Sequence, residues 1–583
     1  MTNPAEELPV YLPGAVVLPS ELVLSLRQDR LVVFAGAGVS IDGPSGLPNF
    51  KDLTQSVCAM ATAPFDPDEP YENQLGDLSD AAFPVHNAVR GIIDRSGSAP
   101  NDWHRAIAGL FPSPDQARIV TTNYDLHLES ALTTDDVWSA PALPLGDSFG
   151  GVVHLHGAVN GPDAGLVVTD GDFGRAYLTQ GWARRFLLSL FQKYDVLFVG
   201  YSHDDVVMQY LARGLPPESE RKRYALVEPG SGISKWLRYR ITAIEWEEDP
   251  SDRYGPGVKA LKEWGRQANL TELHHRQHIE HLIAGGPALD PIDDSYLSRA
   301  LEEPARVSVF TRFASGEEWL RWISDKATFK ILFSSDAVLT EAQGELAKWF
   351  ARTYVMKDEG NPLNLLAEQG GRLSSGLWRA IAYSLWRPGP SVAGVRQPWV
   401  AVLCQQDRGE DPTVLNYLLN ECQLPDDRSS LLLLLQRLFE PNLRIRPGIT
   451  FPGYPPSVSF HIDVAAEEHW VERAIARIIT PQIGAVADGV YLQTTSMLAR
   501  YFHLHQAFGQ VYNGHDPISR MRPAIEPHAQ NRYGGDALMA VDLAREAAIE
   551  QASTRGVEVV AGELLAMRVP ILTRLATWLV AAR

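Results

Sequence analysis

The stretch LVVFAGAGVS, residues 31–40, opens with four apolar residues and continues into a turn with two glycines and a serine. A short, continuous apolar run is typical of a strand that a parallel sheet buries on both faces. Small residues after such a strand let the backbone turn sharply and present N–H groups to an anionic ligand. A Gly-x-Gly turn is also an ordinary way for a chain to leave a strand. The residues of this predicted phosphate-binding loop are Gly36, Ala37, Gly38 and Ser40.

Four more short apolar runs follow before residue 250, and helical patterns separate them. Alternation of this kind indicates parallel strands connected by helices. We therefore predict an α/β fold with a Rossmann-like, doubly wound parallel sheet. The runs are ARIVTTN (117–123), VVHLHG (152–157), DVLFVGYS (195–202) and RYALVEP (223–229).

The second half of the chain has the sequence pattern of a helical protein. Apolar residues recur near the helical period in segments such as 342–355 and 428–440, without a strict internal repeat. The segment AGGPALDPIDD (284–294) combines glycine, proline and acidic residues, as linkers do. We predict a nucleotide-binding domain over residues 1–285 and a mainly α-helical region, a sensor or docking array, over residues 296–583.

Composition narrows the location and the partners of the protein. The chain has 583 residues and a formal net charge of −19, which disfavours direct binding to a nucleic-acid backbone. Its three cysteines, Cys58, Cys404 and Cys422, form no close pair and favour a reducing compartment. The N-terminus lacks a signal-sequence pattern, and no apolar run reaches the roughly 20 residues of a membrane helix. We expect a cytoplasmic protein without a membrane segment.

Four further motifs lie at or just after the ends of predicted strands. GLPNF (46–50) follows the glycine turn, and TTNYD (121–125), LHG (155–157) and GYS (200–202) end three later runs. Open α/β sheets bind ligands at the edge where the carboxyl ends of their strands meet. We therefore expect the side chains of these motifs to converge on one site.

In this order the five motifs resemble those of the sirtuin family: a GAG-x-S loop, a G-[IL]-P segment, an N-x-D motif, a histidine before a glycine, and a G-x-S strand end. The resemblance covers residues 18–250 and implies NAD+ as the substrate. It implies that the glycine loop holds the diphosphate with help from Ser202, and that Asp125 binds the carboxamide of nicotinamide. Further residues expected to contact NAD+ are Pro48, Phe50 and Gly200.

Cleavage of the bond between nicotinamide and ribose requires particular side chains. The reaction passes through an oxocarbenium-like state, so a site must hold the ribose and position a water. The amide of Asn123 is expected to orient the ribose hydroxyls and that water. His156 is expected to accept a proton, because the ordinary pKa of histidine, about 6.5, suits a base at cellular pH. Glu228 is placed to accept hydrogen bonds from the adenosine ribose.

Each candidate also has a structural interpretation. Asn123 and Asp125 could serve as turn formers or helix caps, since both residue types are favoured there. Glu228 could simply be solvated. His156 could be a buried core histidine, and His154, two residues earlier, competes for any role given to it.

Two departures from the sirtuin pattern change the expected reaction. Protein-deacylating sirtuins carry a four-cysteine zinc module between the catalytic histidine and the G-x-S strand end, whereas residues 158–199 here contain no cysteine. We predict no metal site. The family's P-D-F-R segment is replaced by PNFK (48–51), and lysine lacks the forked donors of arginine. The sequence looks more like the divergent bacterial sirtuin-like effectors of antiphage defence, which consume NAD+.

We therefore predict an NAD+ hydrolase that releases nicotinamide and ADP-ribose and acts in antiphage defence by depleting NAD+. The alternatives are an NAD-dependent deacylase or ADP-ribosyltransferase, and a non-catalytic module that senses NAD+ or ADP-ribose. Because a constantly active NADase would kill its own cell, we expect low activity until a trigger or accessory protein binds.

The resemblance also implies a homo-oligomer. Residues 51–118, a long insertion, are expected to form a lid or an oligomer contact, and residues 166–178 a strand, a turn and a helix start. The chain ends in an apolar helical pattern without a polar tail, which fits a piece of a longer protein.

Overall fold

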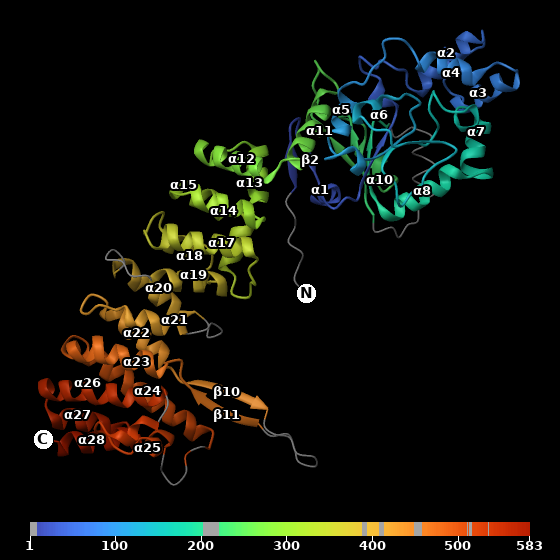
Figure 1. Cartoon of the computed structure of the whole chain (residues 1–583). Helices are drawn as coiled ribbons and strands as arrows, with labels where there is room; N and C mark the ends of the chain where they lie inside the picture. The colour runs from blue at the N-terminus through green and yellow to red at the C-terminus, as the bar shows by residue number, and fades with distance from the viewer. Residues whose placement is uncertain are drawn as a thin grey trace, which may run out of the picture. The chain divides into compact units, whose positions relative to one another are not determined.

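The computed structural model describes residues 9–201, 221–386, 393–406, 413–447, 458–509, 511, 516–533 and 536–582. The chain divides into two compact units, Met1–Ala300 and Leu301–Arg583. The first contains the sheet and the second is mainly helical (Figure 1). The division falls after the linker predicted at 284–294, because α13 (Pro291–Ala300) packs against β1 (Val10–Leu12) of the first unit.

A parallel sheet forms the centre of the first unit and confirms the predicted doubly wound fold. Its strand order among the described residues is β5-β6-β4-β3-β7-β8-β9, and each neighbouring pair runs parallel. Within this sheet the first strand along the chain is the central β3. Strands β4, β5 and β6 then form one side of the sheet, and β7, β8 and β9 form the other. A topological switch point therefore lies between β3 and β7. The strands are β3 Leu31–Ala35, β4 Arg118–Thr121, β5 Val137–Ser139, β6 Gly151–His154, β7 Asp195–Val199, β8 Arg223–Val227 and β9 Thr242–Glu245.

Strand β3 is buried on both faces, as its continuous apolar run predicts. Leu31, Val33 and Ala35 pack into one core, which includes residues of α1, α5 and α11. Val32 and Phe34 point the other way into a second core with α8 and α10. Side chains alternate along a strand, so an apolar residue at every position requires a helical layer on each side. These helices are α1 Ser20–Arg27, α5 Asp102–Ala108, α8 Trp182–Lys193, α10 Ile233–Arg238 and α11 Gly255–Ala268.

The insertion predicted at 51–118 forms a small helical module of its own. Helices α2 (Phe50–Met60), α3 (Tyr71–Asp80) and α4 (Val85–Ile93) pack around a separate apolar core. The module ends before α5, because Trp103 and Ile107 of α5 are buried in the sheet core. Its role as a lid or an oligomer contact stays a prediction.

The strand predicted at the start of 166–178 is wrong, whereas the helix after it is confirmed. Residues 166–168 are extended and buried but do not join the sheet. The reason is that Leu166 and Val168 face the core of the helical module while Val167 faces the core under α8, so the segment bridges two cores. Helix α7 (Asp170–Gly174) and the π-helix η4 (Arg175–Thr179) follow.

The remaining α-helices in the described part of the first unit are α6 (His127–Leu132), α12 (Glu272–Gly285) and α13. A short antiparallel pair, β1 with β2 (Val16–Leu18), precedes α1. None of the helices in the described parts of the chain combines the length and the apolar composition that crossing a bilayer requires.

The second unit is an irregular stack of helices, as predicted. Helices follow one another in chain order in Figure 1, and contacts link α14 to α17, α17 to α19 and α24 to α26. The antiparallel hairpin of β10 (Asn442–Pro447) and β11 (Val458–Asp463) was not predicted. The longer helices are α14 Pro304–Phe313, α15 Glu317–Ser324, α17 Glu341–Phe350, α19 Ser375–Trp386, α20 Ala393–Gln405, α21 Thr413–Asn420, α22 Arg428–Leu438, α24 Ala487–Ala507, α26 Met539–Arg555, α27 Val557–Ala566 and α28 Pro570–Ala581; the shorter ones are α16 Ala327–Lys330, α18 Pro362–Glu368, α23 Glu468–Ala474 and α25 Pro517–Met521.

Glycines bring the ends of β3 and β7 into direct backbone contact. The N–H of Gly36 donates to the carbonyl of Val199 at 2.9 Å, and the N–H of Gly38 donates to the carbonyl of Gly200 at 2.9 Å. A Cβ on Gly38 would lie 2.8 Å from the Cα of Gly200. Gly200 itself has a φ of +74°, and a Cβ there would lie 2.7 Å from the backbone nitrogen of Val39. The close approach of the two strand ends therefore requires glycine at Gly38 and Gly200, whether or not a ligand binds.

We predict that Gly200→Ala lowers the free energy of unfolding by about 1–3 kcal/mol, because the added Cβ has no space and the φ is unfavourable. The measurement is the urea midpoint of the full chain. Gly91→Ala, inside α4 with open space around the position, is the matched control and should be neutral or slightly stabilising. Equal midpoints for Gly200→Ala and the control would contradict the proposed constraint.

Candidate active site

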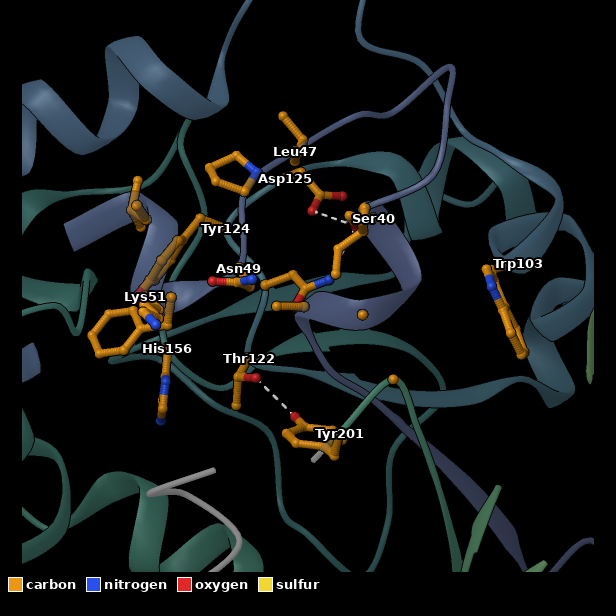
Figure 2. A pocket seen from close by; sticks show the side chains of 18 of the residues that line it. Ser40, Leu47, Asn49, Lys51, Trp103, Thr122, Tyr124, Asp125, His156 and Tyr201 are labelled. Atoms are coloured by element: carbon orange, nitrogen blue, oxygen red, sulfur yellow. Dashed lines mark hydrogen bonds between the residues drawn. The ribbon is translucent and has the colours of Figure 1, made fainter. Parts of the chain in front are cut away.

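A cavity of about 460 Å³ opens at the carboxyl ends of the central strands (Figure 2). Most of the predicted site residues line it, so the structure brings together motifs that are far apart in the sequence. Gly36 does not line the cavity, and its carbonyl accepts a hydrogen bond from Asn123. Ser202 lies outside the described residues. The predicted residues that line the cavity are Ala37, Gly38, Ser40, Pro48, Phe50, Asn123, Asp125, His156, Gly200 and Glu228.

The hydroxyl of Ser40 connects the two polar residues of the TTNYD motif. Ser40 is buried and donates to Oδ2 of Asp125 at 3.0 Å, a contact drawn in Figure 2. The side-chain amide of Asn123 donates from Nδ2 to Ser40 Oγ at 3.1 Å and to the carbonyl of Gly36 at 3.1 Å. The Asn123 amide is thus fixed between the glycine loop and Ser40. The predicted diphosphate contact of Ser40 stays a prediction, and the contacts described here are with Asn123 and Asp125.

His104 completes this network and was not found from the sequence. Its Nε2 lies 3.2 Å from Ser40 Oγ. A carboxylate can only accept, so the Ser40 proton goes to Asp125. On the other side of the ring, His104 Nδ1 lies 3.1 Å from the backbone nitrogen of Asn101 and 2.7 Å from its Oδ1, in the capping box that starts α5. The sequence signal for this capping box was an asparagine, Asn101, three residues before a histidine, His104.

Burial keeps His104 neutral. Burial, with smaller contributions from His127 and Arg105, lowers the pKa of His104 to about 3. The side chain of Asn101 also holds η1 (Ala37–Ser40), because its Nδ2 donates to the carbonyl of Val39 at 2.8 Å. Helix α5 therefore fixes both the backbone of the glycine loop and the hydroxyl of Ser40.

The structural interpretation of the TTNYD motif applies in part. Asp125 does act as a turn former, because its Oδ1 accepts from the backbone N–H of His127 at the start of α6, at 3.1 Å. Its other oxygen faces Ser40. Asn123 caps none of the described helices, and its amide lies in the cavity wall.

Of the two competing histidines, His156 lines the cavity and His154 has a structural role. His154 Nδ1 contacts the carbonyl of Asn123 at 3.1 Å, and its Nε2 contacts the carboxylate of Glu129 at 3.1 Å. Burial is the largest single effect and lowers the pKa of His154, but the hydrogen bond and the charge of Glu129, with smaller contributions from the Asn123 carbonyl and Asp125, together raise the pKa above its ordinary value. The pair of His154, at the end of β6, and Glu129 of α6 therefore supports the backbone of Asn123.

His156 is covered by aromatic side chains. Its Nε2 lies 2.9 Å from the hydroxyl of Tyr177, and the ring of Phe173 meets the imidazole edge to face at 5.2 Å. Burial lowers the pKa of His156 to about 3. The imidazole is therefore neutral at cellular pH, and a base with so low a pKa accepts a proton weakly.

The far end of the cavity, at β8, is lined by aromatic and charged residues. Trp103, Trp246 and Tyr254 contribute to its wall beside Glu228. Glu228 is not simply solvated, because its Oε2 accepts from Nε of Arg253 at 3.0 Å. This end offers flat apolar surfaces and a carboxylate.

The PNFK segment that departs from the sirtuin pattern forms the start of α2. Asn49 is the N-cap of this helix and accepts from the backbone N–H of Asp52 at 2.9 Å. Lys51 lines the cavity with its exposed side chain, so a cation remains at the position where the family has arginine.

Comparisons with known proteins agree with this geometry. Residues 117–244 match the family model of the SIR2-like domain. The chain is 28% identical over 377 residues to an uncharacterized protein, y4cA, of Sinorhizobium fredii, covering 57% of this chain and 30% of that protein. It is 33% identical over 148 residues to NAD-dependent protein deacylase 1 of Pseudomonas aeruginosa, covering 24% of this chain and 47% of that protein. The chain thus spans less than half the length of each relative. Its first unit is sirtuin-like, and that family consists of NAD-dependent enzymes.

The pKa of His104 predicts how stability depends on pH. An unfolded histidine titrates near pH 6.5, whereas His104 in the folded protein has a pKa of about 3. Below pH 6.5 the unfolded chain therefore binds a proton that the folded protein does not. The contribution of His104 to the free energy of unfolding is fully present above about pH 6.5 and is lost as the pH falls towards 3. Between pH 6 and pH 5 the wild-type protein should lose about 1 kcal/mol more stability than His104→Gln, which cannot titrate. Urea unfolding at both pH values measures this difference. Exposed His503→Gln is the control, and an equal pH dependence in wild type and His104→Gln would contradict a buried neutral His104.

Proposed function

We propose that this sirtuin-like unit hydrolyses NAD+ to nicotinamide and ADP-ribose. The observation that carries the proposal is the amide of Asn123, held by Gly36 and Ser40 in the wall of the cavity beside the glycine loop. Both hydrogens of its Nδ2 are directed at protein acceptors. Its carbonyl Oδ1 is therefore the atom that would accept from a ribose hydroxyl or from an attacking water.

A dinucleotide would lie across the strand ends in the order of the sheet. Its adenosine would sit at β8, where Trp246 and Tyr254 offer flat surfaces and Glu228 accepts from a ribose hydroxyl. Its diphosphate would pass Ala37 and Gly38 at β3, over the switch point. Its nicotinamide ribose would then reach β4 and β6, where Asn123 and His156 lie.

In this arrangement each residue has a defined task. The bond between C1 of the ribose and the nicotinamide nitrogen breaks, and the nitrogen keeps the electron pair and leaves as neutral nicotinamide. The Asn123 carbonyl orients the water that forms the new bond to C1, in a site where fixed dipoles stabilise the developing positive charge. His156 accepts the proton that the water loses. The products are nicotinamide, ADP-ribose and a proton.

NAD-dependent deacylation is the second candidate, because one relative is named as a protein deacylase. The sequence between His156 and Gly200 holds no cysteine for the zinc module of deacylating sirtuins, which favours hydrolysis. ADP-ribosyl transfer and non-catalytic sensing are further alternatives. A site that only senses has no use for a fixed amide and an imidazole at the ribose.

We also propose that the protein works in antiphage defence as a homo-oligomer, with the helical second unit as the region that a trigger or accessory protein binds. The resemblance to NAD+-consuming effectors supports this role. An enzyme that depletes NAD+ must be held at low activity until the trigger binds and shifts the population towards an active state.

Asn123→Ala should lower the rate of nicotinamide release at least about 100-fold, as expected for removal of one preorganised transition-state contact. The measurement follows nicotinamide and ADP-ribose after NAD+ is added to the full chain. A parallel reaction contains an acetylated peptide. Nicotinamide release that needs the peptide would favour deacylation, and tight NAD+ binding without turnover would favour a sensor.

Ser40→Ala distinguishes two roles of the hydroxyl. If Ser40 positions Asn123 and Asp125, its loss lowers kcat about tenfold or more and changes KM little, because the contact acts in the transition state. Steady-state kinetics with NAD+ give both constants. A rise in KM at unchanged kcat would instead identify Ser40 as a diphosphate ligand.

A further inference from the structure

The Nε2 atom of His156 already has a hydrogen-bond partner, the hydroxyl of Tyr177. Figure 2 shows the imidazole extending away from the part of the cavity where Ser40 and Asp125 meet. Its Nε2 lies 2.9 Å from the hydroxyl of Tyr177. Phe173 and Tyr177 are stacked with their ring planes 12° apart and together cover the imidazole. His156 is only 2% exposed as a result.

Neither tautomer of His156 leaves Nε2 able to take a proton. With the ring proton on Nδ1, the Tyr177 hydroxyl donates to Nε2 and occupies its lone pair. With the ring proton on Nε2, that atom already carries a hydrogen and donates to Tyr177. A ribose hydroxyl or a water would have to take the place of the Tyr177 hydroxyl, which has the same donor and acceptor chemistry.

The segment that carries Tyr177 is anchored at one end. Asp172 of α7 is buried, and its Oδ2 lies 2.8 Å from Nε2 of His86 on α4. The same oxygen accepts from the backbone N–H of Thr169 at 2.9 Å, and Arg175 bonds to the other oxygen. The anchor holds the start of α7 against the helical module.

The other end of the segment forms a π-helical turn. Tyr177 lies in the middle of η4, a π-helix, and Leu178 after it is 79% exposed. A π-helical turn is wider than an α-helical turn and occurs mostly at functional sites. A change of this turn would move Tyr177 while Asp172 stays in place.

We propose that Tyr177 is a positioning residue that holds His156 in a resting state, with its hydroxyl in the place of the substrate's ribose hydroxyl. This inference rests on the proposed NAD+ hydrolysis and adds its regulation. Movement of η4 (Arg175–Thr179) removes Tyr177 from His156, admits the ribose and the water, and frees Nε2 to accept the proton that the water loses.

The first test is the kinetics of the full-length Tyr177→Phe variant, which keeps the ring and loses the hydroxyl. Its kcat/KM for NAD+ without any trigger should rise roughly tenfold, the effect of one hydrogen bond of about 1.4 kcal/mol, because NAD+ no longer has to displace the Tyr177 hydroxyl. Tyr194→Phe is the matched control, because it also loses one tyrosine hydrogen bond, to the carbonyl of Asp147, away from the cavity. An unchanged or lower kcat/KM in Tyr177→Phe, with an active wild type, overturns the proposal.

The second test does not depend on catalysis. Diethyl pyrocarbonate modifies accessible neutral imidazoles, and mass spectrometry gives the extent of modification of His156. His156 should be protected in the wild type and in Tyr194→Phe and should react at least tenfold faster in Tyr177→Ala. Equal reactivity in the wild type and Tyr177→Ala overturns the proposal. If no variant cleaves NAD+, the proposed hydrolysis has failed, and the reactivity of His156 alone decides on Tyr177.

Discussion

The close contact between the glycine loop after β3 and Gly200 after β7 is the constraint on which the rest of the structure depends. Two strand ends meet there through backbone hydrogen bonds, at separations that leave no space for a Cβ. The contact fixes the loop at the switch point of the sheet, and it places the carbonyl of Gly36 where it accepts from Asn123. Chain packing and the proposed NAD+ binding therefore both favour residues without a side chain at Gly36, Gly38 and Gly200.

Polar groups around this loop are connected in series. Asn101 caps α5 and contacts the imidazole of His104, His104 contacts Ser40, and Ser40 joins Asn123 to Asp125. Buried polar groups are costly unless each finds a partner, so such a network holds its members in a single arrangement. The site is thus rigid at Asn123. The movement that we propose concerns the aromatic side chains that cover His156.

The sheet and the convergence of the site could be predicted, because strand β3 and its neighbours are short apolar runs and their carboxyl ends must share one edge. The edge strands β5 and β9 were missed, since Val137 and Trp138 are exposed and Thr242 is polar. His104 and Tyr177 were missed for a different reason. They reach the site from helices whose packing depends on tertiary contacts, which a pattern read along the chain does not contain.

The central claim is that a dinucleotide lies along this edge with its glycosidic bond at Asn123. A crystal structure of the full chain with bound NAD+ measures this directly. The account predicts the diphosphate beside Ala37 and Gly38, the adenosine at Glu228, and the nicotinamide ribose within about 3.5 Å of the Asn123 side chain. NAD+ bound in the opposite direction, or outside this cavity, would contradict the account.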